Sequence, residues 1–130
     1  MSKLLYLIAP YSDGNIQQTT LNVHKVAQVA GKIIDQSNGY FIPIVIHAEG
    51  WWIETKTGYT SQSTEYWYKH TLEVLKRCDA ALIVGNIGHS KGSLAERAWC
   101  IENDVPYVQV SDSGLENALE YLKWKLEGER

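Results

Sequence analysis

The chain has 130 residues, of which 45% are hydrophobic and 21% charged, and its formal net charge at pH 7 is −3. These totals are typical of a single soluble domain, which we expect to span residues 1–130. They exclude a nucleic-acid polymer as partner, which needs a concentrated basic surface, and a membrane span, which needs about 18 consecutive apolar residues.

The ends and the cysteines favour a cytoplasmic protein. The N-terminal segment MSKLLYLIAP is too short and too strand-like for a signal peptide. Cys78 and Cys100 do not have metal-ligand spacing, so we expect buried free thiols.

The first part of the chain predicts a strand, a turn and a helix. A continuous apolar run over residues 4–8 indicates a buried strand, and residues 9–14 form its turn. Apolar residues then recur at helical spacing, which predicts a helix over about residues 20–37 with Thr19 or Thr20 as its cap.

A second strand and a long connection come next. Asn38-Gly39 ends the first helix, and residues 40–46 predict a strand that Pro43 places near a sheet edge. Residues 47–63 contain Trp51, Trp52, Gly58 and Tyr59 and are interpreted as a long loop, which in a compact domain is usually a lid or binding loop.

The second half alternates helices and strands. Helices are predicted over about residues 63–78, from Ser93 onward and around residues 115–122, and strands over residues 80–84 and 107–110. Strands alternating with helices imply an α/β fold with a mainly parallel sheet.

The turns that follow the strands of such a sheet lie at one edge, where open α/β sheets bind ligands. This edge gathers the first turn, His47 and the segment 90–96, and the helix from about residue 63 begins there. The candidate binding residues are therefore Pro10, Tyr11, Ser12, Gly14, His47, Trp67, Thr71, Ser90 and Gly92.

Glu96 is an unusual residue for this edge. The glycine-rich turn 85–92 leads into a helix whose N-terminal N–H groups favour an anion, yet Glu96 lies one turn into that helix. The pairing suits a site that handles an anion and a developing cation. The alternative is a capping box, in which Glu96 bonds back to the Ser93 backbone.

Other candidates also have ordinary explanations. His70 and His89 suit exposed or hydrogen-bonded histidines as well as a site. Trp51 and Trp52 suit a subunit interface as well as a ligand contact. Three familiar motifs fail: the turn 85–92 departs from a phosphate-binding P-loop, His47-Ala48-Glu49 lacks the remainder of a zinc-deaminase signature, and no GxGxxG opens the first helix.

Three segments together resemble the nucleoside 2-deoxyribosyltransferase-like superfamily, over nearly the whole chain. They are LYLIAPYS at residues 5–12, Cys78-Asp79-Ala80, and Ser90-x-Gly92-x-x-x-Glu96. Within this superfamily the sequence is most similar to the 2'-deoxynucleoside 5'-monophosphate N-glycosidases and to small, often phage-encoded relatives.

The resemblance implies a flavodoxin-like three-layer sandwich with a four- or five-stranded sheet, and a homodimer that needs no metal or cofactor. It implies that Glu96 is the nucleophile, that Tyr6 orients its carboxylate, and that Ser90 helps to hold a 5'-phosphate. His47 falls where the nucleotide-hydrolysing branch has a histidine. Breaking an N-glycosidic bond builds positive charge at C1', which a carboxylate stabilises or captures.

The sequence departs from the family pattern at three places. Thr71 stands where the family has an aspartate that acts on the leaving base, Leu94 replaces a glycine, and the turn around Ser12 has no arginine. Two functions follow as hypotheses: cleavage or transfer at the N-glycosidic bond of a nucleotide or nucleoside, or an idle pocket that binds and sequesters a nucleotide-like ligand.

Overall fold

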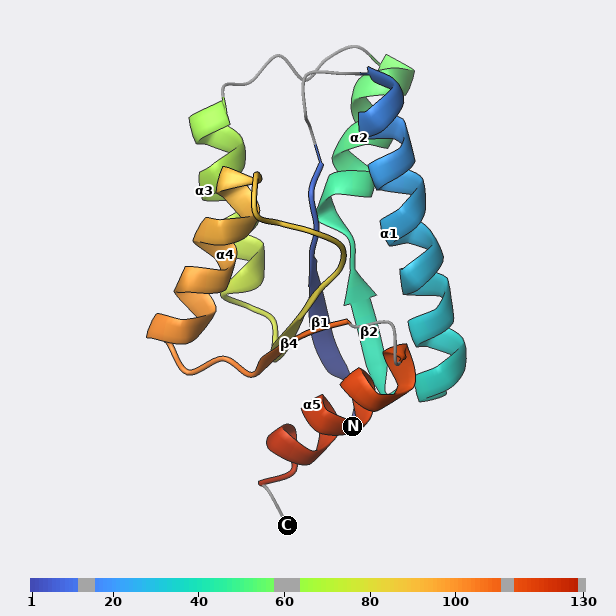
Figure 1. The fold of residues 1–130 in the computed structure, drawn as a ribbon, viewed down its shortest axis with the longest axis vertical. Coiled ribbons are helices and arrows are strands. Elements are labelled where there is room, and N and C mark those ends of the chain that lie inside the picture. The colour runs from blue at the N-terminus through green and yellow to red at the C-terminus, as the bar shows by residue number, and fades with distance from the viewer. Residues whose placement is uncertain (12–15, 58–63, 111–113, 129–130) are drawn as a thin grey trace.

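The computed structural model describes residues 1–11, 16–57, 64–110 and 114–128, which form four strands and five helices (Figure 1). The strands make one parallel sheet in the order β2-β1-β3-β4. In chain order the elements are β1 Lys3–Ile8, α1 Ile16–Ser37, β2 Phe41–Ile44, α2 Ile46–Thr57, α3 Thr64–Leu75, β3 Ala80–Ile83, α4 Lys91–Glu102, β4 Tyr107–Gln109 and α5 Leu115–Leu126.

Helices cover both faces of the sheet, so the expected three-layer α/β sandwich with a flavodoxin-like arrangement is confirmed. Alternate side chains of the buried strand β1 enter different layers because successive residues of a strand point to opposite faces. Leu5 and Leu7 pack with α1 and α5. Tyr6 and Ile8 pack on the other face with residues of α3 and α4, including Leu75 and Cys100.

The strand order creates a switch point between the two central strands. The connection that leaves β1 leads to β2 at one edge of the sheet, and the connection that leaves β3 leads to β4 at the other edge. The two connections therefore run in opposite directions. Open α/β sheets bind ligands in the crevice outside the carboxyl ends of two such strands. The segments that follow β1 and β3 include Ala9 and Ser90, and both line the cavity described below.

The turn and edge predictions around the second strand are confirmed. Asn38 and Gly39 both have positive φ, 50° and 84°, which ends α1 in the left-handed conformation that glycine and asparagine tolerate. Strand β2 lies at a sheet edge, as Pro43 indicated.

Two predictions about local structure are wrong. The segment predicted as a long loop contains α2, and residues 58–63 of it lie outside the described part of the chain. Thr19 and Thr20 do not cap the first helix, because α1 begins at Ile16 and both threonines lie inside it.

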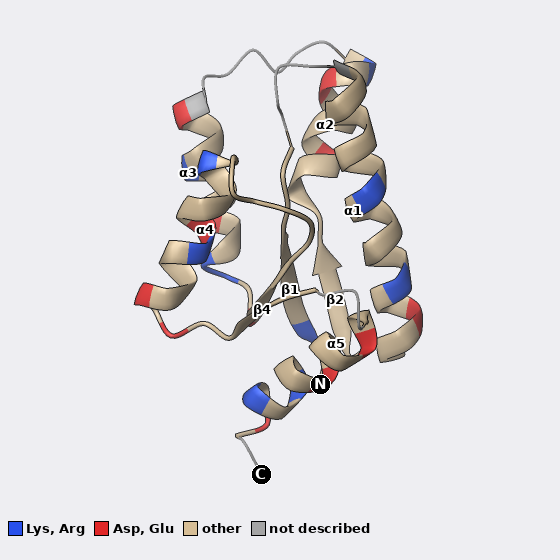
Figure 2. Cartoon of the chain, in the orientation of Figure 1, with Lys and Arg blue, Asp and Glu red and all other residues tan. Residues whose placement is uncertain are grey.

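Both cysteines were expected to be buried free thiols. Both are free, but only Cys100 is buried, and Cys78 is half-buried. Figure 2 shows lysines and arginines spread over several helices among acidic residues. Within the described ranges, no helix is both long enough and apolar enough to cross a membrane.

Candidate active site

A cavity of about 390 Å³ opens at the carboxyl edge of the sheet, next to the switch point. It is within the size range of small-ligand sites. One wall comes from α2, another from α3, and its floor from the start of α4 and the end of β1. The lining residues are Ala9, Tyr11, Ile46, His47, Gly50, Glu54, Trp67, Tyr68, Thr71, His89, Ser90, Lys91, Gly92, Ser93 and Glu96.

The Glu96 carboxyl group lies at the floor of this cavity and is only 2% exposed. The hydroxyl of Tyr6, from the centre of β1, donates a hydrogen bond to its Oε2 atom. Its Oε1 atom is buried and has no hydrogen-bond partner among the described residues. Such an atom is costly to bury unless a ligand or water completes its bonding, so Oε1 is the group in this cavity that is most in need of a partner.

Glu96 does not form the capping box that its spacing from Ser93 suggested. The helix begins at Lys91, and its N-cap is Ser90, three residues before the predicted cap Ser93. Because of this shift, Ser93 and Glu96 lie one turn apart on the buried face of α4, with Cys100 a turn further on. The glutamate therefore points into the protein and not back along the helix end.

Burial raises the pKa of Glu96 from 4.5 to about 7, because desolvation disfavours the carboxylate. The hydrogen bond from Tyr6, and next the nearby hydroxyl of Thr71, oppose this effect and lower the pKa. Burial, and next the negative charge of Glu96, raise the pKa of Tyr6, so the phenol keeps its proton and remains a donor. At neutral pH a substantial part of the Glu96 population is ionised.

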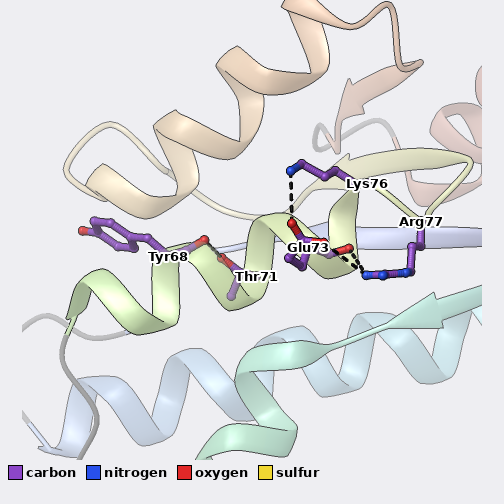
Figure 3. Close-up of polar contacts among 5 residues, drawn as sticks. All are labelled: Tyr68, Thr71, Glu73, Lys76 and Arg77. Atoms are coloured by element: carbon purple, nitrogen blue, oxygen red, sulfur yellow. Dashed lines mark hydrogen bonds and ion pairs between the residues drawn. The ribbon is translucent and has the colours of Figure 1, made fainter.

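Thr71 lies beside this pair, as the sequence predicted, and is 6% exposed. Its Oγ1 atom donates a hydrogen bond to the carbonyl oxygen of Tyr68 at 3.1 Å (Figure 3). The hydroxyl is also close enough to Glu96 to lower the pKa of that carboxyl group. A threonine therefore occupies the place next to the buried carboxylate, and its hydroxyl does not ionise near neutral pH.

Ser90 is engaged in the protein itself. Its Oγ atom donates to Ser93 Oγ at 2.8 Å and accepts from the Ser93 backbone N–H at 3.3 Å, while Ser93 Oγ donates to the carbonyl oxygen of Ala9 at 3.0 Å. The N–H of Leu94 donates to the Ser90 carbonyl. Within the described residues, the backbone N–H groups of Lys91 and Gly92 therefore have no hydrogen-bond acceptor, as is usual in the first turn of a helix.

Gly92 allows α3 and α4 to approach at the cavity. A Cβ atom at this position would lie 3.1 Å from Cε1 of Tyr68, which is closer than ordinary van der Waals contact. A larger residue would displace the tyrosine from the cavity wall. Close packing against Tyr68 thus explains why a glycine occupies position 92.

Aromatic rings form the opposite wall. Tyr11 and His47 stack with ring centroids 5.2 Å apart and an interplanar angle of 17°. Burial lowers the pKa of His47 to about 4, so its imidazole is neutral at pH 7. The ring of Trp67 passes 3.8 Å from the place where a Cβ of Gly50 would stand. All three rings line the cavity, and aromatic faces can stack on a flat ligand.

Not all of the remaining candidate residues line the cavity. Pro10 lines a neighbouring hollow next to Gly85, not the cavity itself. Ser12 and Gly14 lie outside the described residues. His70 stacks on Tyr66 with centroids 5.9 Å apart and is not a lining residue. His89 does line the cavity.

Sequence reasoning missed several lining residues, chiefly those of α2. Ile46, Gly50 and Glu54 follow one another at four-residue spacing and share one stripe of that helix. The spacing is visible in the sequence, but it has no meaning until the segment is known to be a helix. Tyr68 was also missed, and Lys91 was placed at this edge only as part of the segment 90–96.

No three His, Cys, Asp or Glu side chains of the described ranges come close enough together to hold a metal ion. Comparisons of the chain with protein-family models, with curated proteins and with solved structures found no significant match.

The N-cap role of Ser90 predicts how its variants behave. Ser90→Ala should destabilise the protein by about 1 kcal/mol, because it removes the cap and the support of Ser93. Ser90→Asp should keep most of the stability, since aspartate also caps, but should repel an anion at the α4 N-terminus. Urea unfolding measures the first effect and phosphate-ligand titration the second. Equal stability of Ser90→Ala and the parent would contradict the capping role.

Proposed function

We propose that this protein cleaves, or transfers at, the N-glycosidic bond of a nucleotide or nucleoside, with Glu96 attacking C1'. The observation that carries this proposal is the Glu96 carboxyl group, which is buried at the floor of a ligand-sized cavity with Oε1 unpartnered among the described residues. A buried carboxylate with a perturbed pKa in a cavity is typical of a catalytic group.

The two oxygen atoms of the Glu96 carboxylate have different roles in this proposal. Tyr6 holds Oε2 through its hydrogen bond and leaves Oε1 as the attacking atom. As the bond from C1' to the base breaks, positive charge grows at C1' and the carboxylate stabilises or captures it. A 5'-phosphate would be held by the N–H groups at the start of α4 and by Lys91, which is the first residue of that helix and lines the cavity.

The direct test is incubation with a panel of nucleosides and nucleoside monophosphates, in deoxyribose and ribose forms, with free base measured by chromatography. Release of base from at least one member supports the proposal. A second base in the mixture distinguishes transfer from hydrolysis, since transfer yields a new nucleoside. Absence of base release from the whole panel would contradict a glycosidase.

The pKa of Glu96 predicts the pH dependence. Because the nucleophile must be ionised and burial raises its pKa to about 7, kcat/KM should rise from about pH 6 to about pH 8. The Tyr6 hydrogen bond lowers this pKa. Tyr6→Phe should therefore move the midpoint of the profile to higher pH. A profile that is flat over this window, or a midpoint unchanged in Tyr6→Phe, would be incompatible with Glu96 as the titrating nucleophile.

A specific observation favours the second candidate, a pocket that binds a nucleotide-like ligand without cleaving it. The side chain beside Glu96 is Thr71, whose hydroxyl is already bonded to the Tyr68 carbonyl. Ordinary bases leave with the help of a proton, which threonine does not supply. Tight binding of a nucleotide without base release would identify this function.

We propose further that two copies associate next to the cavity. The helices α2 and α3 both contribute to the cavity, and they carry large exposed aromatic side chains: Trp52 is 57% exposed, Tyr66 43% and Tyr68 38%. Aromatic residues are enriched at protein interfaces. Sedimentation at micromolar concentration should show a dimer that Trp52→Glu dissociates. A monomer with full ligand binding would contradict this.

A further inference from the structure

Among the described residues, no side chain beside Glu96 is placed to protonate a neutral leaving base. Thr71 occupies the position beside the nucleophile, and Glu96 itself must be ionised to attack. His47 is neutral at pH 7 because burial lowers its pKa to about 4. His89 and Lys91 flank the Ser90 N-cap of α4, at the end of the cavity where the helix favours an anion. A base that already carries a positive charge could leave without receiving a proton.

The α2 wall suits a positively charged group. Glu54 lines the cavity and forms no ion pair with a described Lys, Arg or His side chain. Burial raises the pKa of Tyr11, and the negative charge of Glu54 is the next cause that raises it. The Glu54 charge therefore acts on a residue that lines the cavity. The rings of Trp67, Tyr11 and His47 lie along the same space. Aromatic faces together with a carboxylate attract cations.

The two ends of the cavity therefore differ in charge. The positive end is formed by Lys91 and by the N–H groups at the start of α4, which have no acceptor in the described part of the chain. Glu54 on α2 forms the negative end. Figure 1 shows α2 and α4 on opposite sides of β1, whose carboxyl end leads into the cavity floor. A molecule with an anionic group at one end and a cationic base at the other would match this polarity.

We infer that the cavity selects N-glycosides whose base already carries a positive charge, such as N-alkylated purine or pyridinium nucleotides, with the base toward Glu54 and the phosphate toward Lys91. The inference rests on the proposed function for its chemistry. Glu96 Oε1 forms a bond to C1' while the bond from C1' to nitrogen breaks, and the electron pair neutralises the cationic base. Water then displaces Glu96 from C1' and releases one proton to solvent.

Matched substrates test this. The probes are guanosine 5'-monophosphate and its 7-methyl derivative, each with ribose and deoxyribose, at mildly acidic pH where the methylated base is cationic. Base release is measured above the rate without protein. Because acid assistance is typically worth about 10²–10⁴ in rate, we expect a preference for the methylated substrate that exceeds the preference of the spontaneous reaction by about 10²-fold.

Glu54→Gln and Glu49→Gln are matched variants, since both change an exposed carboxylate of α2 and Glu49 does not line the cavity. Glu54→Gln should lower kcat/KM for the cationic substrate by about threefold to tenfold relative to kcat/KM for the neutral substrate. Glu49→Gln should change neither. Calorimetric titration of the Glu96→Gln variant measures the same preference in binding alone.

The outcomes separate the two proposals. Cleavage of both substrates that depends on Glu96 but shows no charge preference overturns the inference and leaves the proposed function intact. Preferential, Glu54-dependent binding of the methylated nucleotide without any cleavage supports the inference and overturns the proposed function. Neither cleavage nor preferential binding overturns both.

Discussion

Glu96→Gln is expected to reduce base release by about 10⁴-fold or more, because the amide cannot attack C1'. The same variant should be more stable than the parent above pH 7. The folded parent holds a carboxyl group whose pKa is raised from 4.5 to about 7, whereas the unfolded chain ionises it near 4.5. The parent therefore loses stability as the pH rises through this window, and the variant does not.

The stability difference should be absent below about pH 4.5 and should reach about 1–3 kcal/mol above pH 7. Urea unfolding at both pH values measures it, together with a chromatographic assay of base release. Glu102→Gln is the control, since it changes an exposed carboxylate at the end of the same helix. Undiminished turnover in Glu96→Gln would show that another group attacks the sugar.

Thr71→Asp is expected to raise base release from neutral nucleosides by about 10²–10⁴-fold, or to create it. The aspartate would lie beside Glu96, and two carboxyl groups in contact do not ionise together, so one of them keeps a proton for the leaving base. Thr71→Asn is the control, because it has the shape of aspartate without the acid. The buried substitution should also reduce stability in both variants.

His70→Ala should have little effect on base release, because His70 packs against Tyr66 and Trp67 and is not among the cavity-lining residues. The opposite result for these two variants would change the assignment of the proton donor. An inactive His70→Ala with a Thr71→Asp no better than the parent would mean that the histidine supplies the proton.

The strands and most helices could be predicted because their burial follows simple periods. The run at residues 4–8 is apolar throughout since β1 is covered on both faces, and the stripe of α1 repeats at helical spacing. The helix α2 could not be predicted in this way. Trp51, Trp52 and Ile53 are consecutive, so they spread around the helix, and none of its residues is buried.

The residues around Glu96 could be predicted from the sequence, but those of α2 and the geometry of the helix start could not. Tyr6, Thr71 and Glu96 do come together. The start of α4 was ambiguous because Ser90 and Ser93 are both good N-caps, and the spacing to Glu96 favoured the wrong one. The inward face of that helix is Ser93, Glu96 and Cys100, so its most buried positions include polar residues that an apolar pattern overlooks.

Pro43 limits how two copies of this protein can associate. The Lys3 N–H donates to the Tyr40 carbonyl. Backbone groups alternate in direction along a strand, so the N–H groups of Ile42 and Ile44 point toward β1. The backbone nitrogen of Pro43 points toward the open edge of the sheet. Proline has no N–H to offer there, and the opposite edge strand β4 has only three residues. Neither edge is a good template for another strand. A continuous intermolecular sheet is therefore disfavoured, and self-association is left to the helical surfaces.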